Sequence, residues 1–293
     1  MLSLIMGQPP KVDDVLKKIQ KNFTSIDKNK DSTLEKKFAQ AKSLERSGLY
    51  EEAFILFKEI NREKPGVNKY FQPFKNYLKQ TESWDTLLVY TRDYAIARNQ
   101  DFQSQLEFLD IYIWMDAEPK WQETAFKLTK TLTTNDNSMK SIIQRLVNNG
   151  KYDFAYERLK EYRHETGLKD YYSMEMGTFF GMRMAYDKAV QEYLLFLETH
   201  PQKLQTISDR IMVYPDLPDI MNTITSVLLK SPLQTAQFIL ADLHFKQKAY
   251  NKGYEILKSN GAPPVMLLNY AKDLVSVNEY MKAEIVLTDI INS

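Results

Sequence analysis

The chain of 293 residues contains no cysteine, which excludes disulfides, thiolate metal sites and a cysteine nucleophile. It has only 9 glycines, and none of them forms a phosphate-binding loop or a Gly-x-Ser-x-Gly elbow. The histidines are His164, which we place in a turn between helices, His200 and His244, and none has a second ligand at metal spacing. We therefore expect no catalytic residue, no metal and no cofactor.

An excess of charge of one sign is also missing. Lys plus Arg total 39 against 38 for Asp plus Glu, so the basic field that grips a phosphate backbone is absent and we expect no nucleic-acid partner. No apolar stretch is long enough to cross a membrane. The apolar segment 1–8 is either an ordinary terminus or the remnant of an export signal. The location therefore stays open between the cytoplasm and the periplasm.

Aromatic residues recur at a fixed period of about 34 residues. The set consists of Tyr50, Trp84, Tyr152, Tyr186, Tyr250 and Tyr280, and the first four are separated by one, two and one such periods. A period of this size is typical of a helical repeat array, in which each unit buries its apolar face by stacking on its neighbours. The aromatic content of 12% suits the space between stacked helices.

Three units repeat the same pattern around these aromatic residues. The first reads A-x2-L-x3-G-x-Y-x2-A-x3-F-x7-P, with Ala41, Leu44, Gly48, Tyr50, Ala53, Phe57 and Pro65. The same offsets hold Gly177, Phe180, Met184, Tyr186, Ala189, Tyr193 and Pro201, and then Ile143, Leu146, Gly150, Tyr152, Ala155 and Leu159. This pattern resembles the tetratricopeptide repeat. The resemblance implies an all-α, right-handed superhelical solenoid of seven to eight stacked antiparallel helix hairpins over residues 33–293.

Each recurring residue type in this pattern has a physical role. Small residues such as Ala189 let the two helices of a hairpin approach closely. Gly48 and Gly150 stand where the first helix ends, because glycine adopts a left-handed backbone without strain. Pro65 and Pro201 follow the second helix, because proline cannot continue it.

Other units depart from the pattern. Trp121 comes three residues late for the strict period, which predicts a short insertion near residues 116–120. Residues 204–231 keep helical spacing but are broken by Tyr214-Pro215 and Leu217-Pro218, which predicts a shortened hairpin. Two further units follow at Tyr250 and Tyr280.

Residues 9–32 are interpreted as a capping helix and a polar linker. Val12 to Ile26 form an amphipathic stripe that suits the open end of the array, and a membrane-surface role is the alternative. Four residues of the linker and the following helix match a calcium-binding loop: Asp27, Asn29, Asp31 and Glu35. Two demanding positions do not match, because Ser32 stands where the loop needs glycine and Phe38 where it needs its last Glu. We expect a solvated helix start capped by Ser32 or Thr33 instead.

The tetratricopeptide resemblance also implies a concave groove lined by first-helix side chains that binds a partner protein or peptide. Its family positions, together with one neighbouring aromatic residue, give Gln72, Asn76, Lys140, Gln144, Asn148, Tyr171, Met174, Thr178, Met182, Phe238, Asp242 and Phe245. Gln144 stands where the family's carboxylate clamp has Asn, so recognition of a chaperone tail is not expected. We expect the apolar section from Tyr171 to Phe238 to take an extended segment or a helix.

The rival interpretation is a structural spacer in a larger assembly, such as one of the cell envelope, which contacts its neighbours through its ends. The last helix carries apolar residues without a polar closing helix after it, and solenoids need such a cap. We therefore expect further chain or another subunit to cover Val286, Ile290 and Ile291.

Overall fold

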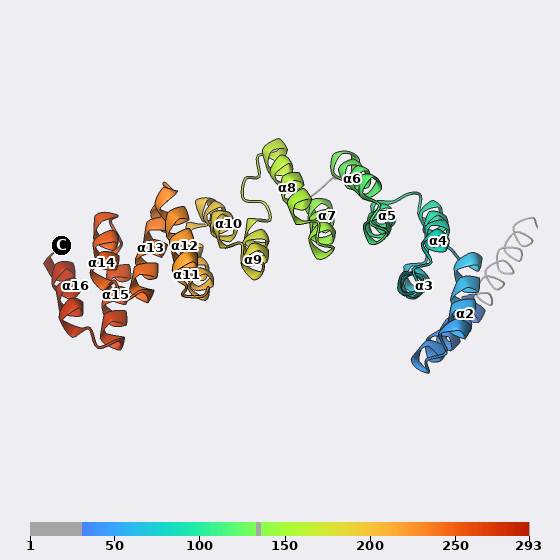
Figure 1. Cartoon of the computed structure of the whole chain (residues 1–293), viewed down its shortest axis with the longest axis horizontal. Helices are drawn as coiled ribbons and strands as arrows, with labels where there is room; N and C mark the ends of the chain where they lie inside the picture. Colours follow the sequence, from blue (N-terminus) through green and yellow to red (C-terminus); the bar gives the residue numbers. More distant parts are fainter. Residues whose placement is uncertain (1–30, 133–135, 293) are drawn as a thin grey trace, which may run out of the picture. The chain divides into compact units, whose positions relative to one another are not determined.

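The computed structural model describes residues 31–132 and 136–292, and within these ranges it contains helices and no strand (Figure 1). The chain divides into two compact units, Met1–Arg158 and Leu159–Ser293. The interpretations of segment 1–8, of the helix from Val12 to Ile26 and of Asp27 and Asn29 lie outside the described residues. None of the helices in the described ranges is both long and apolar enough to cross a membrane.

The first unit consists of helices in its described residues. A helix over residues 31–46 is followed by α2 (Tyr50–Glu63), α3 (Asn68–Gln80), α4 (Trp84–Ala97), α5 (Phe102–Trp114), α6 (Glu118–Lys127), a π-helical segment (Leu128–Leu132), α7 (Asp136–Asn148) and the start of α8 (Tyr152–Thr166). Each helix from α2 to α5 packs against the next one, and α7 packs on α5 and on the π-helical segment before it. Because the turns between paired helices are short, neighbouring helices run antiparallel.

The second unit also consists of helices in its described residues (Figure 1). It holds the end of α8, α9 (Ser173–Met182), α10 (Tyr186–Thr199), a 3-10 turn (Pro201–Lys203), α11 (Leu204–Met212), α12 (Pro218–Lys230), α13 (Gln234–Lys246), α14 (Tyr250–Ser259), α15 (Pro264–Ser276) and α16 (Tyr280–Asn292). The pairs α9–α10, α13–α14 and α15–α16 pack as hairpins, whereas α11 packs on α13, and α12 on α10 and α13. The all-α class and the hairpin architecture are confirmed, and the short α11 agrees with the predicted shortened hairpin.

The predicted period is kept without interruption in five consecutive second helices. These helices begin at Tyr50, Trp84, Glu118, Tyr152 and Tyr186, so each start follows the previous one by one full period. A positive φ occurs two residues before each start, at Gly48, Glu82, Asp116, Gly150 and Met184. The expected insertion near residues 116–120 is therefore wrong. Glu118 stands where the other four units have Tyr or Trp, and Trp121 stands where three of them have Ala. Later second helices begin at Pro218, Tyr250 and Tyr280, and the steps between these starts are slightly shorter than the period.

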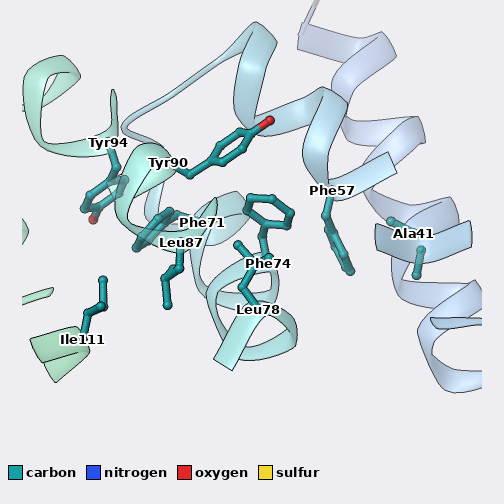
Figure 2. Packing of buried hydrophobic residues seen from close by; sticks show 10 residues of the cluster. Ala41, Phe57, Phe71, Phe74, Leu78, Leu87, Tyr90, Tyr94 and Ile111 are labelled. Atoms are coloured by element: carbon teal, nitrogen blue, oxygen red, sulfur yellow. The ribbon is translucent and has the colours of Figure 1, made fainter. Parts of the chain in front are cut away.

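Aromatic rings fill the space between successive helices of the first unit (Figure 2). Phe71 stacks on Tyr94 with ring centroids 4.1 Å apart, and Phe74 meets Tyr90 edge-on at 4.7 Å. In the second unit, a Cβ added to Gly177 would lie 2.5 Å from Cε1 of Tyr193. The small residue at this position thus permits the close approach of α9 and α10, as the pattern predicts.

Two expectations about particular residues are wrong, and a third is wrong for one of its residues. Ser32 and Thr33 do not cap a helix start, because the chain is already helical at residue 31. His164 lies within α8 and not in a turn. Val286 needs no cover from another chain, because it is only 1% exposed inside the last hairpin, where Ile290 lies at the edge of the same cluster. Ile291 is 83% exposed, and its cover by further chain or another subunit stays a prediction.

The two acidic residues of the calcium-like pattern that the structure describes both pair with lysines. Asp31 lies 2.5 Å from Nζ of Lys64, and Glu35 lies 2.5 Å from Nζ of Lys69. Tyr70 also donates to Glu35 at 2.7 Å. The carboxylates of Asp31 and Glu35 therefore connect the helix over residues 31–46 to the end of α2 and to the start of α3.

Candidate functional site

A pocket of about 560 Å³ lies among the first helices of the last three hairpins. Residues of α11, α13 and α15 form most of its wall. The lining consists of Leu204, Gln205, Ser208, Asp209, Met212, Phe238, Asp242, Phe245, Lys246, Leu257, Pro263, Val265, Met266, Asn269, Tyr270 and Asp273. First helices therefore line a hollow here, as the resemblance implies.

Helix α13 supplies the centre of this pocket. Phe238, Asp242 and Phe245 share one face because side chains spaced by four and then three residues project from the same side of a helix. Ala241 precedes Tyr250 by nine residues, as Ala41 precedes Tyr50 in the first unit. Together with Lys246, these residues stand three before and one, four and five after Ala241, which are the positions that the resemblance assigns to the groove. The structure thus brings three of the predicted site residues into one pocket.

The floor of the pocket is apolar and closely packed. Phe238, Leu257 and Tyr270 are buried in the cluster that holds the last two hairpins together. The ring of Phe245 meets that of Tyr270 edge-on with centroids 5.3 Å apart. The hydroxyl of Tyr270 donates to the carbonyl of Tyr250 at 2.7 Å, and burial raises its pKa, so it stays neutral. This packing fixes the floor in one arrangement.

One carboxylate comes from each of the three helices. Asp242 lies deep, and its carboxylate accepts a hydrogen bond from Ser208 Oγ at 2.5 Å. Burial raises the pKa of Asp242 to about 6; the Ser208 bond opposes this, while Asp273 and Asp209 raise it further. Asp209 and Asp273 are exposed at the rim, and partial burial also raises the pKa of Asp273. The pocket therefore combines an apolar floor with negative charge.

The predicted residues near α9 lie outside this pocket's lining. Thr178 accepts a hydrogen bond from Arg210 Nη1 at 2.6 Å, and the carbonyl of Tyr171 accepts one from Arg163 Nε at 2.9 Å. Met174 is half-buried on α9, and Met182 is 80% exposed at its end. Their role in binding stays a prediction.

The predicted residues of the first unit are divided between α3 and α7. Gln72 donates to Glu107 of α5 at 3.3 Å and to Asn68 at 2.9 Å, so its amide is already used within the fold. The remaining four are exposed and stay predictions: Asn76, Lys140, Gln144 and Asn148.

Glu107 belongs to a buried charge network that connects first helices. Lys75 of α3 lies 2.5 Å from Glu107, and both side chains are buried. Arg145 of α7 pairs with Asp110 of α5 and lies 3.8 Å from Glu107. Lys75 stands one period after Ala41, where the repeat pattern has a small residue, and the pattern is therefore weak in this unit. In this unit the first-helix face is used for cohesion.

The sequence analysis missed the acidic partners of Asp242. Asp273 stands two residues after the small residue Ala271, which is not one of the family positions, and no family positions were projected onto the shortened hairpin that holds Asp209. The signal that could have found them is simple: an acidic residue recurs at Asp209, Asp242 and Asp273, at steps close to one period. In the described part of the chain, no group of three or more His, Asp or Glu residues is placed to hold a metal ion.

Comparisons with known proteins add little to this geometry. No family model matches the sequence, and no curated protein matches it. Among solved structures, the chain is similar to the TPR2AB domain of yeast Sti1 in its complex with pHSP90. The identity is 16% and the TM-score 0.31, over 87% of this chain and 99% of that chain. The description of this chain as a tetratricopeptide-like array of helices therefore rests on its own hairpins and on their regular period.

Proposed function

We propose that this protein is a non-catalytic interaction scaffold that binds a segment of a partner protein against its first helices. The observation that carries this proposal is the pocket of α11, α13 and α15. Its volume and its mixture of an apolar floor with a few polar groups are typical of binding sites. Its floor is packed by the buried residues Phe238, Leu257 and Tyr270, which favours a pocket that is formed before a partner arrives.

The experiment uses neutral substitutions so that charge does not confuse the result. Random twelve-residue peptides displayed on phage are selected on the full chain, and the affinity of the enriched peptides is measured by fluorescence anisotropy. The variant Val265→Gln/Met212→Gln places two amides on the apolar wall of the pocket. We expect it to weaken the selected peptides at least tenfold, because one desolvated apolar side chain contributes about 1.5–3 kcal/mol.

The matched control is Val213→Gln/Met281→Gln, which changes the same residue types at exposed positions outside the pocket lining. It should change affinity less than twofold. Circular dichroism and thermal unfolding check that both variants remain folded. No enriched peptide, or equal binding by both variants, contradicts the proposed function.

The structural spacer remains the rival proposal. A spacer should associate with itself in a concentration-dependent way, whereas a receptor for a peptide should stay monomeric. Light scattering coupled to chromatography distinguishes the two, and a defined oligomer that binds no peptide would favour the spacer.

A further inference from the structure

The side chains that line the pocket carry more negative than positive charge. Asp209, Asp242 and Asp273 come from three successive first helices and surround the same hollow. Each of the two rim carboxylates is close enough to Asp242 to raise its pKa, so the three act on one volume. Ser208 satisfies one oxygen of Asp242 but brings no positive charge.

Lys246 is the basic residue among the described side chains that line the pocket, and it does not neutralise these carboxylates. Its Nζ donates to the carbonyl of Met212 at 2.9 Å and to that of Tyr214 at 2.8 Å. These carbonyls stand at the C-terminal end of α11, where a cation is favoured by the helix dipole. The ammonium group is thus occupied by the fold, and the negative potential of the pocket remains for a ligand.

We propose that the pocket selects a partner segment in which lysine or arginine side chains alternate with large apolar residues. This inference rests on the proposed function and names its partner chemistry. The apolar residues would pack on Phe238, Phe245 and Met266, while the cations would reach the carboxylates above them. A positive group near Asp242 relieves the repulsion among three like charges, which gives specificity as well as attraction.

The spacing of the helices indicates the spacing of the basic residues. Packed helices lie about 8–10 Å apart, and an extended segment advances about 3.3 Å per residue. A segment that crosses α11, α13 and α15 therefore meets a new carboxylate about every three residues. The expected pattern is two basic residues separated by two others, of which at least one is apolar.

Charge variants of the full chain test this inference. The rim variant is Asp209→Asn/Asp273→Asn, and the deep variant is Asp242→Asn. The control Glu255→Gln/Glu284→Gln removes two exposed negative charges from α14 and α16, outside the pocket lining. Peptides selected from the random library on the wild-type chain are synthesised and measured against all of these proteins.

We expect the selected peptides to be basic and apolar. The rim variant should weaken them at least tenfold and the deep variant at least fivefold, whereas the control should stay within twofold of the wild type. Replacing the lysines of a selected peptide with glutamine, or its apolar residues with serine, should each weaken binding at least tenfold.

The outcomes separate the two proposals. If peptides bind and are lost on Val265→Gln/Met212→Gln, but are acidic or neutral and insensitive to the aspartate variants, this inference is overturned and the proposed function stands. Undiminished binding of the serine-substituted peptide would show a site for any polycation and would also overturn it. A library that yields no binder removes both.

Discussion

Replacing Asp242 with asparagine should make the protein more stable at neutral pH while it weakens the binding of a basic segment. The folded protein raises the pKa of this carboxyl from an ordinary value of 3.8 to about 6. The folded-state pKa lies above the unfolded one, so ionisation of Asp242 costs folding free energy. That cost is absent below pH 4, grows as the pH rises towards 6 and is complete above it.

The magnitude follows from the difference of about 2 pKa units, each of which corresponds to about 1.4 kcal/mol. The wild type therefore loses on the order of 3 kcal/mol at pH 7.5 through this one group. Asparagine cannot ionise, and its carbonyl oxygen can still accept the hydrogen bond of Ser208. Its amide hydrogens need partners in the pocket, so we expect a net gain of about 1–3 kcal/mol.

Urea unfolding followed by circular dichroism at pH 7.5 and pH 5.0 measures this difference. The charges that face Asp242 are Asp209 from α11, Asp273 from α15 and Lys246 on its own helix, and all of them remain in the variant. The gain should be largest at pH 7.5 and should be smaller by about 1.4 kcal/mol at pH 5.0, where the carboxyl is mostly protonated in the folded protein. A variant that is no more stable than the wild type at pH 7.5, or a gain independent of pH, would refute the reasoning. A stabilising substitution that reduces binding is the trade-off expected of a functional residue.

Three further predictions concern packing, buried charge and pH. Gly177→Ala should lower stability by about 1–3 kcal/mol in thermal unfolding, because its Cβ would meet the buried ring of Tyr193 at 2.5 Å; an unchanged midpoint would contradict the close approach. Glu107→Gln should cost about 3–5 kcal/mol because it leaves the ammonium of Lys75 buried and unpaired, whereas Lys75→Met/Glu107→Leu should recover most of that loss in urea titrations. A basic peptide selected on the pocket should bind up to about tenfold more tightly at pH 7.5 than at pH 5.0, because Asp242 is mostly protonated at the lower pH; equal affinities in anisotropy titrations would argue against contact with this carboxyl.

The sequence predicted the hairpins wherever the repeat uses residues with one clear physical role. Gly48 and Gly150 mark left-handed turns, and the structure has both with positive φ. Glu82 and Asp116 occupy the same backbone conformation without being glycine, so the turn before α6 left no signal. The aromatic position of that unit holds Glu118, which made Trp121 look displaced. A repeat can be recognised in a sequence only where the residue type reveals the backbone conformation, as glycine does at a positive φ.

The candidate pocket was predictable on one helix and not on its neighbours. Phe238, Asp242 and Phe245 follow from the position of Ala241 in a regular unit. Asp209 and Asp273 depend on where α11 and α15 lie against α13, which is a property of packing between helices. The pattern of a single repeat does not contain that information.

The polar contacts between neighbouring hairpins have a further consequence for how the chain folds. Lys75 and Glu107 are 32 residues apart, Ser208 and Asp242 are 34 apart, and Tyr254 and Asp289 are 35 apart. Each of these bonds closes a loop of about one repeat, so the entropy lost on forming it is small and similar along the chain. Order can therefore start at any hairpin and spread to the next one in either direction. A nascent chain leaving the ribosome could complete its early hairpins before the residues of the pocket have been synthesised.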